Sequence, residues 1–123
     1  MRRKILIVED EMLAALYLKT TILDLGYDVL DIAPSGEKAV EISRGRKPDM
    51  VFMDIRLAGE IDGIEAAKEI LKIHSVPLVF LSAYSDDKTI KSAQAINHAG
   101  FYEKPINEYQ LKAILNAAFE SAT

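Results

Sequence analysis

The chain has 123 residues, of which 50% are hydrophobic and 28% charged, with a formal net charge of −4 and no cysteine. This composition favours one folded domain over residues 1–123 and excludes intrinsic disorder, disulfides and cysteine–zinc sites. It offers neither a basic block for nucleic acid nor an apolar stretch long enough for a secretory signal or a membrane span, so we expect a cytoplasmic protein.

The first quarter of the chain alternates short apolar runs with a longer amphipathic one. The run over 4–8 is apolar, largely β-branched and bounded by charge, which predicts a buried strand. A helix is predicted from about 11 to 25, because Gly26 then stands where a C-terminal cap belongs. A half-exposed strand follows over 27–33. The residues that repeat at helical spacing in the first helix are Leu13, Leu16, Tyr17, Thr20 and Leu23.

The same alternation continues through the middle of the chain. Ser35 is the expected N-cap of a helix that ends near Gly45. The apolar run over 49–53 predicts a third strand that ends at Asp54. After a loop, Asp62 opens another helix, whose apolar stripe is Ile64, Ala67, Ile70 and Leu71.

The last third adds two strands and two helices. A strand over 78–81 follows Pro77, and a helix capped by Asp86 or Asp87 is predicted to run to about 99. A less apolar strand over 100–103 precedes a helix over about 107–119. Strict alternation of strands and helices predicts an α/β fold with a doubly wound parallel sheet, covered on both faces.

Charged and hydroxyl side chains follow four of the five predicted strands. These strands end in Glu9–Glu11, Asp54, Ser82 and Lys104, whereas Ala33 and Pro34 end the remaining one. In parallel α/β sheets the carboxyl ends of the strands form the ligand-binding edge. Each residue taken singly has an ordinary interpretation, such as a turn residue or a solvated surface lysine. Their joint position at one edge of the sheet favours a shared site.

The chemistry of these groups indicates phosphoryl transfer. Clustered carboxylates repel one another unless a cation neutralises them, and oxygen ligands suit Mg²⁺. A carboxylate such as Asp54 can act as the nucleophile and form an aspartyl-phosphate. The incoming phosphoryl group needs positive charge and hydrogen-bond donors, which Mg²⁺ at Asp10, the ammonium of Lys104 and the hydroxyl of Ser82 would supply.

Over its whole length the sequence resembles the receiver domain of two-component response regulators, including the chemotaxis regulators. The resemblance implies a flavodoxin-like five-stranded sheet in the order 2-1-3-4-5. It is carried by several segments that occur in this order with helix-length spacing between them: Ile5–Glu11, Val51–Leu57, Asp62–Gly63, Phe80–Ala83 and Lys104–Pro105.

The resemblance also implies a role for each matched residue. Asp54 matches the phosphorylation site, and Lys104 the lysine that pairs with the phosphoryl group. Mg²⁺ would be held by Glu9, Asp10, Asp54 and the backbone carbonyl of Arg56.

Further positions match two switch residues and a cis peptide bond of the family. Ser82 matches the switch hydroxyl, Phe101 the switch aromatic, and Lys104–Pro105 a cis peptide bond. The sequence departs from the commonest pattern in having Glu9 in place of aspartate, Ser82 in place of threonine and Phe101 in place of tyrosine. None of these changes removes a required functional group.

The implied function is that of a signalling domain rather than a turnover enzyme. A histidine kinase or phosphotransfer protein would donate the phosphoryl group to Asp54 in a Mg²⁺-dependent reaction. The modification would switch the face formed by the segments 86–99, 100–103 and 107–119, toward an unknown downstream protein or output domain or a second copy of the chain. Arg56 and Tyr84, each two residues beyond a site residue, are bulky and predict slow self-dephosphorylation.

Three rival interpretations make different predictions. An aspartate-nucleophile phosphatase needs an acid/base aspartate at the position of Arg56. A flavodoxin-like cofactor carrier needs a phosphate-binding loop where Glu9–Glu11 would repel phosphate. A degenerate receiver that serves only as an interaction scaffold would not need Asp54, Ser82 and Lys104 together.

Overall fold

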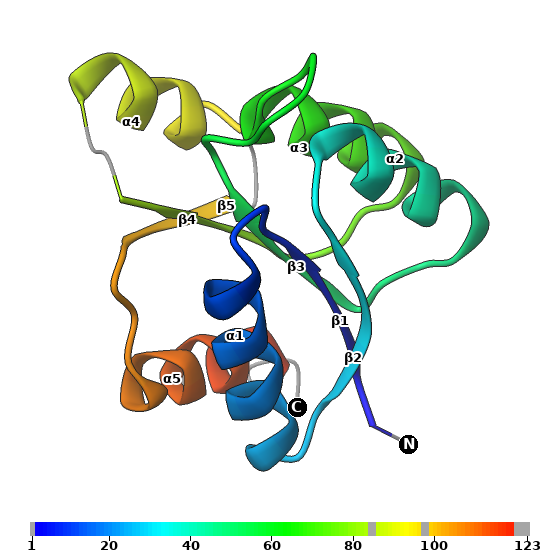
Figure 1. Cartoon of the computed structure of the whole chain (residues 1–123), viewed down its shortest axis with the longest axis vertical. Helices are drawn as coiled ribbons and strands as arrows, with labels where there is room; N and C mark the ends of the chain where they lie inside the picture. Colours follow the sequence, from blue (N-terminus) through cyan, green and yellow to red (C-terminus); the bar gives the residue numbers. More distant parts are fainter. Residues whose placement is uncertain (1, 84–85, 97–98, 120–123) are drawn as a thin grey trace.

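The computed structural model describes residues 2–83, 86–96 and 99–119, and its centre is a five-stranded sheet in the order β2-β1-β3-β4-β5. Every neighbouring pair of strands is parallel, as predicted (Figure 1). The strands are β1 (Lys4–Val8), β2 (Asp28–Ala33), β3 (Met50–Asp54), β4 (Leu78–Ser82) and β5 (Ala99–Glu103). The helices are α1 (Met12–Asp24), α2 (Gly36–Gly45), α3 (Gly63–Ile73), α4 (Asp87–Gln94) and α5 (Glu108–Phe119).

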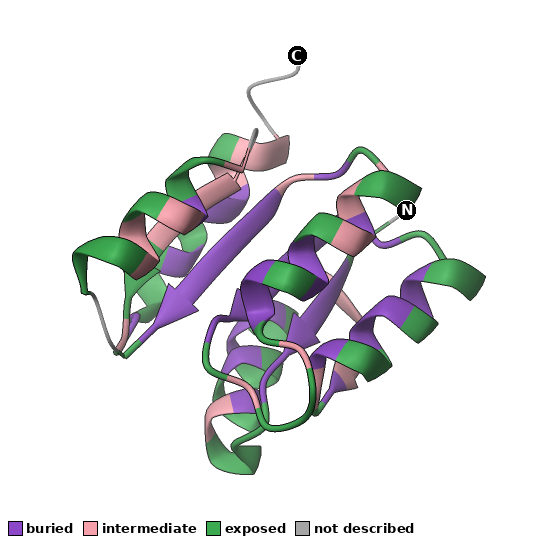
Figure 2. Ribbon diagram, turned by 90° about the horizontal axis from the view of Figure 1, so that it is seen from above, coloured by how far each residue is buried: buried purple, intermediate pink, exposed green. Residues whose placement is uncertain are grey.

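The helices form two layers on opposite faces of the sheet. Figure 1 shows α1 and α5 on one face and α2, α3 and α4 on the other. Figure 2 shows the central strands buried between helices whose outer sides are exposed. The doubly wound architecture expected from the alternating sequence is therefore confirmed.

Side chains of the central strands alternate between two cores. One core, beneath α2, α3 and α4, includes Leu6, Met53 and Phe80, and the other, beneath α1 and α5, includes Ile7 and Phe52. Each of these side chains is at most 1% exposed. Burying a large apolar side chain is worth about 1.5–3 kcal/mol, so the three central strands form a firm base for the residues at their ends.

The predicted helix caps are present. The Oγ of Ser35 accepts a hydrogen bond from the N–H of Lys38 at 3.1 Å. Asp62 and Glu65 form a reciprocal capping box at the start of α3. Such caps satisfy backbone donors that the first helical turn leaves without partners, and they fix where each helix begins.

Two sequence predictions are wrong in detail. The helix expected to run to about 99 ends at Gln94, and Ala99 already belongs to β5. Ala93 is the only described side chain of α4 that is fully buried, so little packing would hold a longer helix together. The residues at helical spacing in α1 are not its buried face, which consists of Ala15, Leu18, Thr21 and Ile22.

The misassigned face of α1 has a physical explanation. Apolar residues surround most of this helix, so periodicity alone does not single out one stripe. The small side chain of Ala15 lets the helix approach the sheet, while Leu13 stays 76% exposed and Tyr17 45% exposed.

No helix within the described residues combines the length and apolar character needed to cross a bilayer.

Candidate functional site

Three carboxylates meet at the carboxyl ends of β1 and β3, where the strand order reverses. One oxygen each from Glu9, Asp10 and Asp54 lies within 4.8 Å of the others. Glu9 and Asp10 directly follow β1, and Asp54 is the last residue of β3. An oxygen-only donor set of this kind could hold a hard divalent cation such as Mg²⁺.

Asp54 is buried, with only 8% of its surface exposed. Its Oδ1 accepts a hydrogen bond from the N–H of Arg56 at 3.3 Å, and its Oδ2 accepts one from the Nζ of Lys104 at 3.2 Å. Burial raises the pKa of Asp54, the Lys104 charge opposes this, and the neighbouring charge of Glu9 adds to it, so the pKa is raised to about 6. The group is therefore mostly ionised at neutral pH.

Glu9 and Lys104 form an ion pair within the cluster. The Nζ of Lys104 donates to Oε1 of Glu9 as well as to Asp54, and Oε2 of Glu9 accepts from the N–H of Glu11 at 3.1 Å. Burial acts to raise the pKa of Glu9, but the Lys104 ammonium and the Glu11 amide together lower it. Burial acts to lower the pKa of Lys104, and its bond to Glu9 and the charge of Asp54 outweigh this and raise it.

Asp10 is the exposed member of the carboxylate group. Its Oδ2 accepts a hydrogen bond from the N–H of Ala58 at 3.2 Å, which ties the start of α1 to the connection between β3 and α3. Arg56 lies in that same connection, and its side chain reaches Asp86, the N-cap of α4, at 3.7 Å. Both side chains of this ion pair are more than half exposed, so it adds little stability.

The two expected switch residues lie on β4 and β5, and Ser82 is hydrogen-bonded to Lys104 of the cluster. Ser82 is 1% exposed and its carbonyl accepts the N–H of Lys104 at 2.9 Å. Phe101 pairs with Phe80 across β4 and β5 and is half-buried. The Lys104–Pro105 peptide bond is cis. Tyr84 lies outside the described residues, so slow self-dephosphorylation stays a prediction.

Two residues beside the site were not given a role by the sequence. A Cβ at Gly63 would lie 2.0 Å from the carbonyl oxygen of Asp54, so a glycine is needed where α3 passes the end of β3. The feature of the sequence that could have indicated this role is the Asp62–Gly63 pair at the start of the helix. Glu37 accepts a hydrogen bond from the N–H of Ile61 at 2.9 Å, and no spacing in the sequence indicates this contact.

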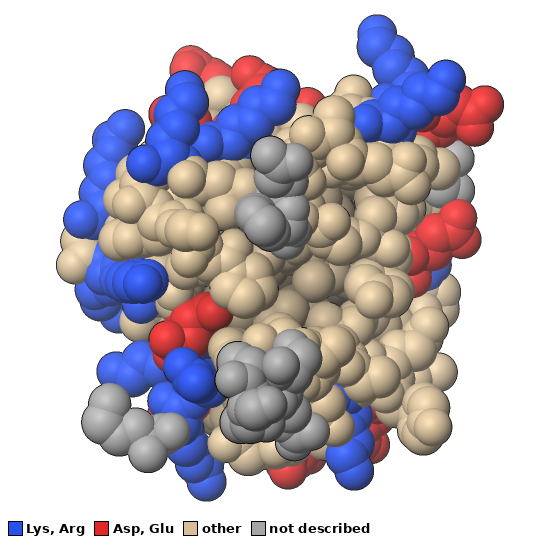
Figure 3. Space-filling view, turned by 180° about the vertical axis from the view of Figure 1, so that it is seen from behind, with Lys and Arg blue, Asp and Glu red and all other residues tan. Residues whose placement is uncertain are grey.

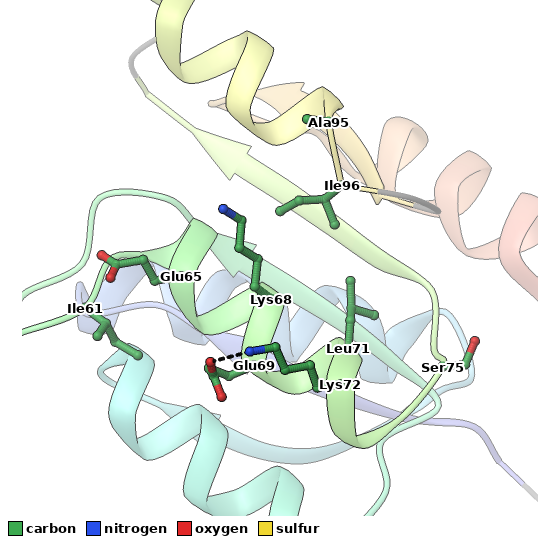
Figure 4. Close-up of a pocket in the computed structure, with 9 residues that line it drawn as sticks. All are labelled: Ile61, Glu65, Lys68, Glu69, Leu71, Lys72, Ser75, Ala95 and Ile96. Carbon is green, nitrogen blue, oxygen red and sulfur yellow. Dashed lines mark hydrogen bonds and ion pairs between the residues drawn. The ribbon is translucent and has the colours of Figure 1, made fainter.

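One cavity lined by described residues lies apart from the carboxylates. It measures about 740 Å³ and lies between α3 and the residues that follow α4. Leu71 and Ile96 give it an apolar lining and Lys68 extends across it (Figure 4). On the side opposite to that of Figure 1, most charged side chains lie around the rim of a largely uncharged surface (Figure 3). Neither feature contributes a group to the carboxylate cluster.

Comparison with known proteins places these features in a family context. Residues 5–116 match the family described as the response regulator receiver domain. The transcriptional regulatory protein PdtaR of Mycobacterium tuberculosis is 34% identical over 105 residues, which are 85% of this chain and 51% of that protein. The phyllosphere-induced regulator PhyR of Methylorubrum extorquens is 31% identical over 96% of this chain and 44% of its own length. The chain thus spans about half the length of these two relatives.

Other relatives match along nearly their full length. The chemotaxis protein CheY of Thermotoga maritima is 34% identical, over 94% of this chain and 97% of that protein. The crystal structure of the signal receiver domain of a modulated diguanylate cyclase from Desulfovibrio desulfuricans superimposes with a TM-score of 0.91 and 33% identity. That superposition covers 98% of this chain and 96% of that one.

Proposed function

The chain belongs to the response regulator receiver domain family, and from this premise we propose that it accepts a phosphoryl group on Asp54 in a Mg²⁺-dependent reaction. One observation carries the proposal. Asp54 ends a buried strand beside two further carboxylates, and the ammonium of Lys104 lies 3.2 Å from its Oδ2. This set contains the nucleophile, the cation ligands and the charge that phosphoryl transfer requires.

Asp54 would act directly as the nucleophile. With a pKa of about 6 its carboxylate is mostly ionised at neutral pH, so no general base is needed. A carboxylate oxygen attacks phosphorus in line as the bond from phosphorus to the donor's histidine nitrogen breaks, and that nitrogen keeps the electron pair. We propose that the donor is a phosphohistidine on a histidine kinase or a phosphotransfer protein.

The surrounding groups would stabilise the transferred charge. Bound Mg²⁺ supplies positive charge to the phosphoryl oxygens. Glu9, Asp10, Asp54 and the carbonyl of Arg56 are the oxygens that would hold the ion. Lys104 already contacts Asp54, so its ammonium can shift from the carboxylate to a phosphoryl oxygen without leaving Glu9.

The signal would pass from the phosphoryl group to the face formed by α4, β5 and α5. The group adds about −1.5 to −2 charge and strong acceptor oxygens, toward which the Ser82 hydroxyl can turn. Phe101 then rotates into the space that Ser82 leaves. Tyr102 and Tyr109, which are 40% and 82% exposed, give this face aromatic groups for a downstream protein or a second copy of the chain.

Labelling with a small phosphodonor tests the proposal. We expect wild-type protein to take up about one phosphoryl group per chain with Mg²⁺ present, and no label once a chelator removes the metal. Asp54→Asn should lose the label because an amide is not a nucleophile. Asp24→Asn, at the far end of α1, is the charge-matched control and should label normally. Undiminished labelling of Asp54→Asn would overturn the assignment.

A further inference from the structure

The connection between β3 and α3, residues 55–62, is held at two points by side chains from other elements. On one side, the N–H of Ala58 donates to Oδ2 of Asp10 at 3.2 Å. On the other, the N–H of Ile61 donates to Oε1 of Glu37 at 2.9 Å. Two residues, Gly59 and Glu60, thus separate the amide bonded to a proposed metal ligand from the amide bonded to a carboxylate on α2.

The Glu37 carboxylate is closely fitted to this connection. Gly59 has a φ of +111°, and a Cβ built there would lie 2.5 Å from Oε2 of Glu37. A Cβ at the neighbouring Gly36 would lie 2.9 Å from the Cγ1 of Ile61. Glycine therefore appears on both sides of the contact, where α2 and the connection approach most closely.

The Glu37 carboxylate has a neutral partner. Within the described residues its side chain forms no ion pair with lysine or arginine, and the hydrogen bond that it accepts comes from a backbone amide. Glu37 also lies in the first turn of α2, where any negative charge is favourable. The effect of the hydrogen bond from Ile61 can be separated from the effect of negative charge at the start of α2, because glutamine keeps the acceptor oxygen and removes the charge.

We propose that Glu37 is a positioning residue for the Mg²⁺ site. By holding residues 58–61 against α2, Glu37 would keep the Ala58 amide hydrogen-bonded to Asp10. It would also restrain the backbone of the connection that carries the Arg56 carbonyl. This inference rests on the proposed function, because that function assigns Asp10 and Arg56 to the metal. Groups that orient metal ligands from a distance commonly affect metal affinity without touching the ion.

Three variants test the role of Glu37 through Mg²⁺ affinity, which is read from the amide chemical shifts of Asp10 and Ala58 during titration. Glu37→Ala should weaken Mg²⁺ binding about 3- to 10-fold and speed hydrogen exchange at the Ile61 amide. Glu37→Gln should stay within about 2-fold of wild type, because its side-chain oxygen still accepts from Ile61. Glu41→Ala is the control, since Glu41 lies one turn along the same helix, is exposed, and pairs with Lys38 at 3.5 Å.

Each other outcome overturns the inference. Wild-type affinity in Glu37→Ala would show that the contact does not position the site. Equal weakening in Glu37→Gln and Glu37→Ala would assign the effect to charge at the start of α2, and a wild type that binds no Mg²⁺ would remove the site itself. Labelling of wild-type Asp54 separates the two proposals. A protein that shows the expected affinities but takes up no phosphoryl group would disprove the proposed function alone.

Discussion

At the scale of single residues, the site is defined by two buried carboxylates that share one ammonium. Glu9 and Asp54 both accept hydrogen bonds from Lys104, and their pKa values shift in opposite directions. Because two negative charges share one positive charge, one of the two carboxyl groups holds its proton to higher pH than the other, and here that group is Asp54. The nucleophile is thus the carboxylate whose ionised form is least stabilised by its surroundings.

Burial of Asp54 makes stability depend on pH. In the unfolded chain this carboxyl loses its proton near its ordinary pKa of 3.8, and in the folded protein it keeps the proton up to about 6. Between these values the folded state binds more protons, so stability falls as pH rises through this window and levels off above it. Without metal, Asp54→Asn should therefore be more stable than wild type, by a margin that grows by about 1–2 kcal/mol from pH 4.5 to pH 7.5.

Chemical denaturation at several pH values in the presence of a chelator measures this margin. Asp24→Asn, at an exposed position at the end of α1, serves as the charge-matched control. A constant margin for Asp54→Asn across the range would contradict a raised pKa for Asp54.

At the scale of elements, the sequence determines where strands and helices begin better than which face they bury. Ser35 and Asp62 are cap residues whose side chains hydrogen-bond locally, so their sequence signal is direct. The buried face of α1 depends on how closely Ala15 approaches the sheet, and local spacing carries no information on that distance. The early end of α4 likewise follows from sparse tertiary packing.

The close approach of α3 to the end of β3 can be tested by adding a methyl group at Gly63. Gly63→Ala would place a Cβ 2.0 Å from the Asp54 carbonyl oxygen, so backbone must shift, at a cost of about 3 kcal/mol. Gly45→Ala is the matched control, because it lies at the end of α2 with no atom within 4 Å of its Cβ position. It should be neutral or stabilise by up to about 1 kcal/mol. Thermal unfolding of both variants measures the difference, and equal stabilities would refute the close contact.

At the scale of the whole molecule, parallel topology explains why so much of the site was predictable. Once strands and helices alternate, the carboxyl ends of all strands lie at one edge, so Glu9, Asp10, Asp54 and Lys104 come together whatever the loop conformations are. The Glu37 contact was not predictable in this way. It depends on the path of residues 55–62, and only the folded backbone fixes that path.

The same topology concentrates like charge at one end of an apolar sheet, so a cation should stabilise the entire fold. If Mg²⁺ binds the cluster of Glu9, Asp10 and Asp54, a concentration ten times its Kd adds about 1.4 kcal/mol to the free energy of unfolding. For a domain of this size that raises Tm by roughly 3–6 °C, and a chelator should reverse the rise. Asp10→Asn should lose most of it, whereas NaCl at equal ionic strength should not reproduce it. An equal rise in Asp10→Asn would place the ion elsewhere, because the exposed Asp10 is the member of the cluster that Lys104 does not neutralise.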